Sequence, residues 1–99
     1  MESNNYYYAV IFTSIRTEVQ EGYNEMAERM SLLASQQEGF LGEESAPGIT
    51  ISYWKNLEAI KNWKEHPEHK SAQQIGKEKW YSSYHTRIAR IEREYSFNK

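Results

Sequence analysis

The fold is decided by the central stretch of the chain, residues 49–69, which reads ITISYWKNLEAIKNWKEHPEH. Its first six residues are a short run of mostly β-branched and aromatic side chains that alternates apolar and polar residues before it ends in Tyr-Trp, a pattern that predicts a strand over residues 49–54. Asn56 then opens a short helix to about residue 64, whose apolar positions at helical spacing are Leu57, Ile60 and Trp63. Pro67 fits the first turn of a further helix, where its missing N–H costs nothing.

A strand and a long helix are predicted upstream of this stretch, after residues 1–5, which we expect to be frayed. Residues 6–14 are rich in aromatic and β-branched side chains and contain no breaker, which predicts a strand. Thr17 and Gln20 have the spacing of a capping box, so a helix is expected to start there and to end at Gly39. Its apolar stripe consists of Val19, Tyr23, Met26, Ala27, Met30, Leu33 and Ala34.

The remaining segments complete a β-α-β-β-α-β order. Residues 40–45 and 49–54 are predicted strands joined by Pro47-Gly48, a dipeptide suited to a type II turn. The helix that contains Pro67 is expected to run to about Ser83, and residues 85–97 form the last strand. With right-handed crossovers, this order predicts a single ferredoxin-like α+β domain over residues 1–99, a four-stranded antiparallel sheet with helices on one face.

Both faces of the first strand are apolar, with Tyr6, Tyr8, Val10 and Phe12 on one side and Tyr7, Ala9, Ile11 and Thr13 on the other. Helices cover only one face of such a sheet, so the second face needs another cover. A two-fold homodimer that packs sheet on sheet, a dimeric α+β barrel, is the predicted solution. The alternative is a lone domain with one sheet face in water.

The last predicted strand is unusually rich in charge. Alternation puts Arg87 and Arg93 on one face and Arg90 with Glu92 on the other. One of these two sets is expected at the dimer seam, paired with carboxylates of the second strand such as Glu43 or Glu44.

Composition narrows the class of protein. The chain has no cysteine, so disulfides, thiolate nucleophiles and Cys-ligated metal centres are excluded. With 12 Lys+Arg against 14 Asp+Glu, the net charge of −2 provides no broad attraction to nucleic acid. The N-terminus lacks a signal-peptide pattern, and no apolar run approaches the roughly 20 residues that span a bilayer. We therefore expect a cytoplasmic protein that binds neither nucleic acid nor membrane.

The strand end Tyr53-Trp54, the turn from Trp63 to His69 and the segment Gly39-Phe40-Leu41-Gly42 resemble the antibiotic biosynthesis monooxygenase domain of the dimeric α+β barrel superfamily. The resemblance covers almost the whole chain. It implies a pocket between sheet and helices in which polycyclic aromatic substrates are oxidised by O₂ without metal or flavin.

The same superfamily has a haem-degrading branch, to which this chain corresponds only in part. Trp63 stands where that branch has its tryptophan. The iron-ligating histidine of the branch falls near Gln73 by spacing, and residues 6–14 lack the asparagine of its first strand. Haem degradation is therefore not predicted, and no cofactor is expected.

A candidate site lies along the last predicted helix, where His69, Ala72, Gly76 and Trp80 form one stripe with Tyr84 beyond it. A gap at Gly76 would admit a flat ligand, and His69, beside apolar surface, is the best candidate for a general base or hydrogen-bond donor. The expected substrate-binding residues are Trp54, Trp63, Trp80 and Tyr84. The alternative is that the stripe is only the core face of the helix.

A metal site is not predicted from the histidines. His66 and His69 lie three residues apart beside Glu65 and Glu68, but a catalytic metal needs three converging protein ligands. His66 is expected instead to cap the helix or to line the pocket.

Two functions remain open from the sequence. The first is a cofactor-independent monooxygenase that acts on a small aromatic or quinone-like molecule. The second is a non-catalytic dimeric module that binds a hydrophobic small molecule. They differ in whether an acid–base group lies inside the pocket.

Overall fold

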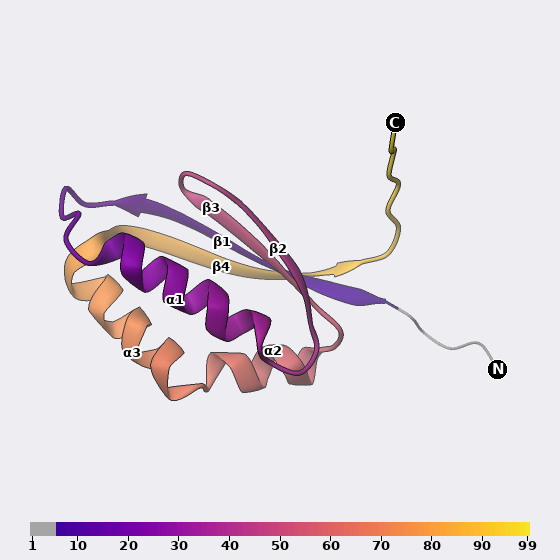
Figure 1. The fold of residues 1–99 in the computed structure, drawn as a ribbon, viewed down its shortest axis with the longest axis horizontal. Coiled ribbons are helices and arrows are strands. Elements are labelled where there is room, and N and C mark those ends of the chain that lie inside the picture. Colours follow the sequence, from indigo (N-terminus) through magenta and orange to yellow (C-terminus); the bar gives the residue numbers. More distant parts are fainter. Residues whose placement is uncertain (1–5) are drawn as a thin grey trace.

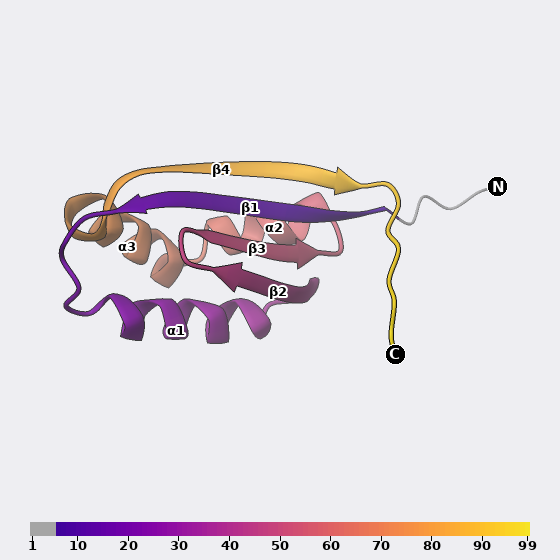
Figure 2. The ribbon, with the colours of Figure 1, turned by 90° about the horizontal axis from the view of Figure 1, so that it is seen from above.

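The structure, a computed structural model, describes residues 6–99, so the expectation for residues 1–5 lies outside it. Its sheet has the strand order β2-β3-β1-β4 with every neighbouring pair antiparallel, and the helices lie on one side of it (Figures 1 and 2). The elements are β1 (Tyr7–Arg16), α1 (Tyr23–Ser35), β2 (Phe40–Ala46), β3 (Ile49–Trp54), α2 (Leu57–Lys64), α3 (Pro67–Ile75), a π-helical turn (Gly76–Trp80) and β4 (Tyr81–Ile91). The predicted ferredoxin-like α+β fold is confirmed.

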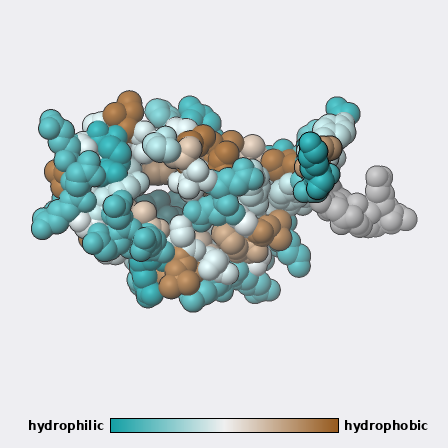
Figure 3. Space-filling view, turned by 45° about the horizontal axis from the view of Figure 1, so that its top comes forward, coloured by the Kyte–Doolittle hydropathy of each residue, from teal (hydrophilic) through white to brown (hydrophobic). Residues whose placement is uncertain are grey.

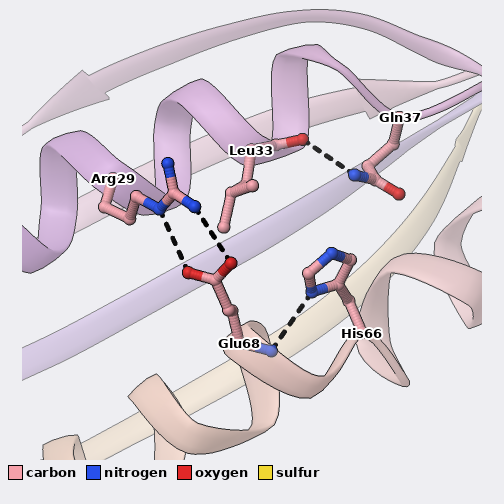
Figure 4. A network of polar contacts seen from close by, with 5 residues as sticks. All are labelled: Arg29, Leu33, Gln37, His66 and Glu68. Atoms are coloured by element: carbon pink, nitrogen blue, oxygen red, sulfur yellow. Dashed lines mark hydrogen bonds and ion pairs between the residues drawn. The ribbon is translucent and has the colours of Figure 1, made fainter.

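The two short helices start as their sequences predict. Asn56 has an extended backbone, and its side-chain oxygen accepts a hydrogen bond of 2.8 Å from the N–H of Ala59, which caps α2. Pro67 occupies the first turn of α3. His66 caps that helix, because its Nδ1 accepts the N–H of Glu68, as Figure 4 shows. The capping role expected for His66 is therefore confirmed.

Strand register separates the side chains of the sheet into two sets. Val10 on β1 lies between Ser52 of β3 and Ile88 of β4, and it packs on the helices. Ile11, the next residue, lies between Ile51 and Arg87 and points to the opposite side. We call these two sides the helix face and the open face, and the open face is turned toward the viewer in Figure 2.

Helix α1 starts six residues later than predicted, at Tyr23 after Gly22, whose φ is 81°. The Thr17 capping box is therefore wrong. The Thr17 hydroxyl donates instead to the carbonyl of Lys79 and accepts the N–H of Val19. These contacts hold the segment after β1 against the end of the π-helical turn, which leaves no room for a helix there.

The last helical segment ends at Trp80 and not at Ser83, so Tyr84 belongs to β4. The carbonyl of Trp80 accepts the N–H of Thr17 at 2.9 Å and the Nε–H of Arg16 at 3.0 Å. Because Arg16 at the end of β1 and Thr17 after it bond to this carbonyl, it is not available to a further helical turn. The helix stops, and β4 begins at Tyr81. β4 also ends earlier than predicted, at Ile91, and residues 92–99 leave the sheet (Figure 1).

An ion pair ties α1 to α3 on the helix side of the molecule. Arg29 donates from Nε and Nη2 to the two carboxylate oxygens of Glu68, each at 3.0 Å (Figure 4). The hydrogen bond from Arg29 lowers the pKa of Glu68. Both side chains are about half exposed, so the contact orients the two helices more than it stabilises them.

None of the helices described between residues 6 and 99 has the length and apolar character needed to cross a bilayer. The buried core lies between the sheet and the helices. The core is centred on Trp54, which has no exposed surface. The cluster around it consists of Leu33, Ala34, Trp54, Ala59, Ile60 and Trp63.

Gly39 lies in the loop before β2 and allows this loop to approach α2 closely. Its φ is 90°, and a Cβ there would lie 2.5 Å from the Cβ of Ala59. We predict that Gly39→Ala lowers the free energy of unfolding by about 1–3 kcal/mol for the backbone alone and by more for the clash. Gly48→Ala, with φ 84° and its nearest neighbour 3.4 Å away, isolates the backbone cost. Urea denaturation should show Gly39→Ala as the less stable variant, and equal stabilities would contradict the contact.

Candidate functional site

Three of the five predicted site residues form one continuous stack between the sheet and the helices. Trp54 of β3 lies parallel to Trp63 of α2, with ring centroids 6.3 Å apart and an interplanar angle of 22°. His69 of α3 stacks on the other side of Trp63 at 4.4 Å and 9°. Both tryptophans are buried while His69 is half-buried, so the stack leads from the core toward solvent.

The hydrogen bonding of His69 defines which ring nitrogen is free. Its Nδ1 lies 3.1 Å from the carbonyl oxygen of Trp63. Because a carbonyl can only accept, Nδ1 carries the hydrogen and Nε2 keeps its lone pair. Burial lowers the pKa of His69 below its ordinary value; the hydrogen bond to the Trp63 carbonyl raises the pKa by less, and the charge of His66 makes a smaller contribution that lowers it. The imidazole is therefore neutral at neutral pH and offers an unprotonated nitrogen that can accept a proton.

The other two predicted residues, Trp80 and Tyr84, belong to a separate aromatic cluster. Trp80 is buried, donates from Nε1 to the carbonyl of Glu21 at 2.9 Å, and packs edge-on against Tyr23 at 5.9 Å. Tyr84 on β4 lies against Phe12 of β1, with ring centroids 5.1 Å apart. The structure thus divides the predicted site between two clusters.

Tyr81 lies at the centre of this second cluster, although it is not among the predicted site residues. Its ring contacts Phe12 and Tyr84 at 5.5 and 5.8 Å, and its hydroxyl lies 3.5 Å from that of Tyr23. Burial raises the pKa of Tyr81, and the hydrogen bond to Tyr23 raises it further. Tyr81 is therefore a neutral phenol that can donate a hydrogen bond. The guanidinium of Arg16 covers the Tyr23 ring at 3.3 Å.

Gly76 does not leave the expected gap for a ligand. A Cβ at Gly76 would lie 2.8 Å from Cε2 and 2.9 Å from Cδ2 of Tyr81. The expectation of an open space beside Gly76 is therefore wrong, because the ring of Tyr81 occupies it. The glycine allows this tyrosine to pack against the π-helical turn.

The two clusters lie end to end along the helix face of β1. Val10 packs against the cluster that contains Trp63, and Phe12, two residues on, contacts Tyr81 and Tyr84. Val10 and Phe12 are only half-buried although β1 is a central strand, and Ile88 beside Val10 is 52% exposed. The helices therefore leave part of the helix face uncovered. Figure 3, in which the top of Figure 1 is turned toward the viewer, shows a hollow left of the middle of the molecule.

The candidate site is this uncovered aromatic surface together with the polar groups beside it. We define the site by Val10, Phe12, His69, Tyr81, Tyr84 and Ile88. It combines a flat apolar surface, a neutral imidazole with a free nitrogen and tyrosine hydroxyls. Such a surface can hold a flat aromatic molecule and remove a proton from it.

Solved structures share this architecture. A protein from Nitrosomonas europaea described as a proposed antibiotic biosynthesis monooxygenase superposes with a TM-score of 0.68 at 15% identity, over 90% of this chain and 92% of that one. SnoaB of Streptomyces nogalater, a cofactor-independent oxygenase, gives 0.70 at 9% identity over 92% and 97%. A dimeric protein of unknown function from Bacteroides fragilis with a ferredoxin-like fold gives 0.64 at 19% over 89% and 98%. The chain therefore shares the ferredoxin-like fold of these proteins.

One relative is close in sequence. The chain is 47% identical over 98 residues to the uncharacterized protein YqjZ of Bacillus subtilis, in an alignment that covers 94% of this chain and 86% of that one. The protein belongs to the same family as YqjZ. No protein-family model matches the chain.

The lowered pKa of His69 predicts how stability depends on pH. The unfolded histidine titrates near pH 6.5, above the folded value, so between the two values the unfolded chain binds more protons. The free energy of unfolding should be retained in full above about pH 6.5 and should decrease as the pH falls through the folded pKa. Urea denaturation across this range should show a smaller decrease in His69→Gln. Identical pH profiles would contradict the burial of the ring.

Trp63 should matter first for stability, because it joins the core to His69. Trp63→Ala is expected to lower the free energy of unfolding by about 3–5 kcal/mol through the cavity it leaves. Leu57→Ala, on the exposed side of the same helix, is the matched control and should change stability little. Chemical denaturation of the two variants measures the difference, and similar losses would contradict the core role of Trp63.

Proposed function

We propose that this protein is a cofactor-independent monooxygenase that acts on a small aromatic or quinone-like substrate. The observation that carries the proposal is the half-buried imidazole of His69, which is bonded through Nδ1 to the Trp63 carbonyl and stacks on Trp63, a member of the cluster against which Val10 packs. The oxygenase SnoaB shares the fold, and the fold is compatible with this chemistry without determining it.

The proposed reaction starts with proton removal by His69. A phenolic substrate with an activated CH₂ group loses a proton to Nε2, and the resulting carbanion is stabilised by delocalisation over the ring system. The anion transfers electrons to O₂. The CH₂ group becomes a carbonyl, one atom of O₂ enters the product, and the other leaves as water with the two hydrogens of the CH₂ group. We propose that on substrate binding the Tyr81 hydroxyl exchanges its 3.5 Å hydrogen bond to the Tyr23 hydroxyl for one to the oxyanion of the substrate.

The predicted binding residues take different parts in this proposal. Tyr84 lies on the uncovered surface and is proposed to contact the substrate ring. Trp63 and Trp80 are buried, so they would border the substrate only by their edges. Trp54 has no exposed surface and would act by supporting Trp63.

A non-catalytic module that binds a hydrophobic small molecule is the second candidate. The burial of the three tryptophans favours it, because these rings serve the core whether or not a substrate binds. In both cases we propose a cytoplasmic homodimer that associates through the open face of the sheet. One neighbour of the same fold is described as dimeric.

Oxygen uptake with a panel of hydroxylated polycyclic aromatics tests the proposal. The protein should consume one O₂ per product molecule, and added chelator should not change the rate. His69→Gln should lower kcat by about 10²–10⁴-fold while thermal-shift affinity for the substrate stays within the same order. His66→Gln removes a helix cap and a charge near His69 but no group of the candidate site, so it is the matched control and should keep most of its activity.

The outcome separates the two candidates. Ligand binding without oxygen uptake across the panel would identify a binding module. Oxygen uptake that survives in His69→Gln would show that another group is the base.

A further inference from the structure

The helix face of the sheet changes from polar to apolar across its strands. One row of opposed residues contains Glu43 of β2, Ser52 of β3, Val10 of β1 and Ile88 of β4, and the next row contains Ser45, Thr50, Phe12 and Thr86 in the same strand order. Directly opposed residues point to the same side of a sheet, so both rows lie on the side where Val10 packs on the helices. β2 and β3 thus carry a carboxylate and hydroxyls beside Val10 and Phe12, which belong to the candidate site.

Glu43 is the charged residue of these two rows, and its side chain is bonded to α1. Its Oε2 accepts a hydrogen bond of 2.8 Å from the hydroxyl of Ser31, on the helix that runs beside β2 (Figure 2). Within residues 6–99, Ser31 is the only hydrogen-bond partner of this carboxylate, and no ion pair includes it. One carboxylate oxygen therefore remains available as an acceptor on the helix face. Glu43 is turned away from the open face, where the sequence predicted a carboxylate of β2 at the dimer seam.

Ser52, directly opposite Glu43, offers the complementary group. Its Oγ accepts the indole N–H of Trp54 at 2.8 Å. Because an indole N–H can only donate, the hydroxyl hydrogen of Ser52 can be donated to another group. Opposed side chains in neighbouring strands have Cβ atoms about 4.5–5.5 Å apart. Glu43 and Ser52, which both lie in the described part of the chain, nevertheless form no hydrogen bond with each other, so an acceptor and a donor lie side by side next to Val10.

A hydroxyl group is the substituent that satisfies both of these side chains at once. It can donate its hydrogen to the available oxygen of Glu43 and accept the hydrogen of Ser52. An ether or a carbonyl can only accept, and an ammonium group can only donate, so each of these would leave one of the two side chains without a partner. β1 and β2 are separated by two strand spacings, about 10 Å. The edge of a flat ring system that lies on Val10 and Phe12 therefore reaches toward Glu43.

We propose that Glu43 is a specificity-determining residue of the candidate site, which selects flat aromatic molecules that carry a hydroxyl group on the edge facing β2. The carboxylate accepts the hydroxyl hydrogen, Ser31 fixes the orientation of the carboxylate, and Ser52 donates to the hydroxyl oxygen. The proposal rests on the proposed function, whose site it extends to β2 and β3 and whose substrate it defines further by the position of a hydroxyl group. It concerns binding alone, and it applies whether the bound molecule is oxidised or only retained.

Equilibrium dialysis of the full chain against 2-naphthol and 2-methoxynaphthalene tests the assignment. The two probes share one ring system and differ in whether their single oxygen can donate a hydrogen. The measured quantity is the ratio of the Kd of 2-methoxynaphthalene to the Kd of 2-naphthol, in which the general affinity of the apolar surface for the rings cancels. Glu43→Ala should lower this ratio by about tenfold, because a hydrogen bond to a charged group is lost. Glu28→Ala, at an exposed glutamate of α1, is the matched control and should leave the ratio unchanged.

The results distinguish this proposal from the function on which it rests. A ratio in Glu43→Ala equal to that of wild type would overturn the role of Glu43 and leave the monooxygenase proposal standing. A wild type that binds neither probe would overturn the role of Glu43 together with the candidate site. The expected change of the ratio in a protein that consumes no oxygen would support the role of Glu43 and overturn the monooxygenase. Circular dichroism checks the fold of each variant, and Glu43→Gln, which keeps a neutral acceptor, replaces Glu43→Ala if that variant unfolds, with a smaller decrease of the ratio expected.

Discussion

The stack of Trp54, Trp63 and His69 is the interaction on which the rest of the structure depends. It joins β3 to α2 and α2 to α3 through parallel rings, and the bond between His69 and the Trp63 carbonyl fixes the turn between the two helices. Because the stack begins in the core and ends at a half-buried imidazole, the same contacts that hold the helices on the sheet also set the tautomer of His69. Stability and proposed chemistry therefore share one set of residues.

The two faces of the sheet differ in what covers them and in the side chains that they carry. Its helix face is covered incompletely, which leaves Val10, Phe12 and Ile88 partly exposed, and this is the surface proposed for a ligand. Its open face carries a row in which two isoleucines lie between Glu44 and Arg87, a composition compatible with the proposed second copy of the chain. The surfaces proposed for ligand binding and for association therefore lie on opposite sides of β1, so a substitution on one side tests one proposal without removing the other surface.

The sequence predicted the fold because each element had a local signal. Alternation marked the strands, and Asn56 and Pro67 marked the helix starts. The site was predicted only in part. Trp63 and His69 stack on each other across the turn between α2 and α3, whereas Trp80 and Tyr84 belong to the second aromatic cluster. Tyr81 was missed because the stripe through Gly76 and Trp80 continues to Tyr84 at helical spacing. The helix stops only because Arg16 and Thr17, more than sixty residues earlier, bond to its last carbonyls, a contact that no local pattern reveals.

The central claim is that His69 is neutral with its proton on Nδ1 and its Nε2 free. The ¹⁵N chemical shifts of the His69 imidazole, followed through a pH titration, measure this directly. We expect a protonated Nδ1 and an unprotonated Nε2 at neutral pH, with a pKa below the ordinary value of about 6.5. A proton on Nε2, or a pKa at or above the ordinary value, would contradict the account.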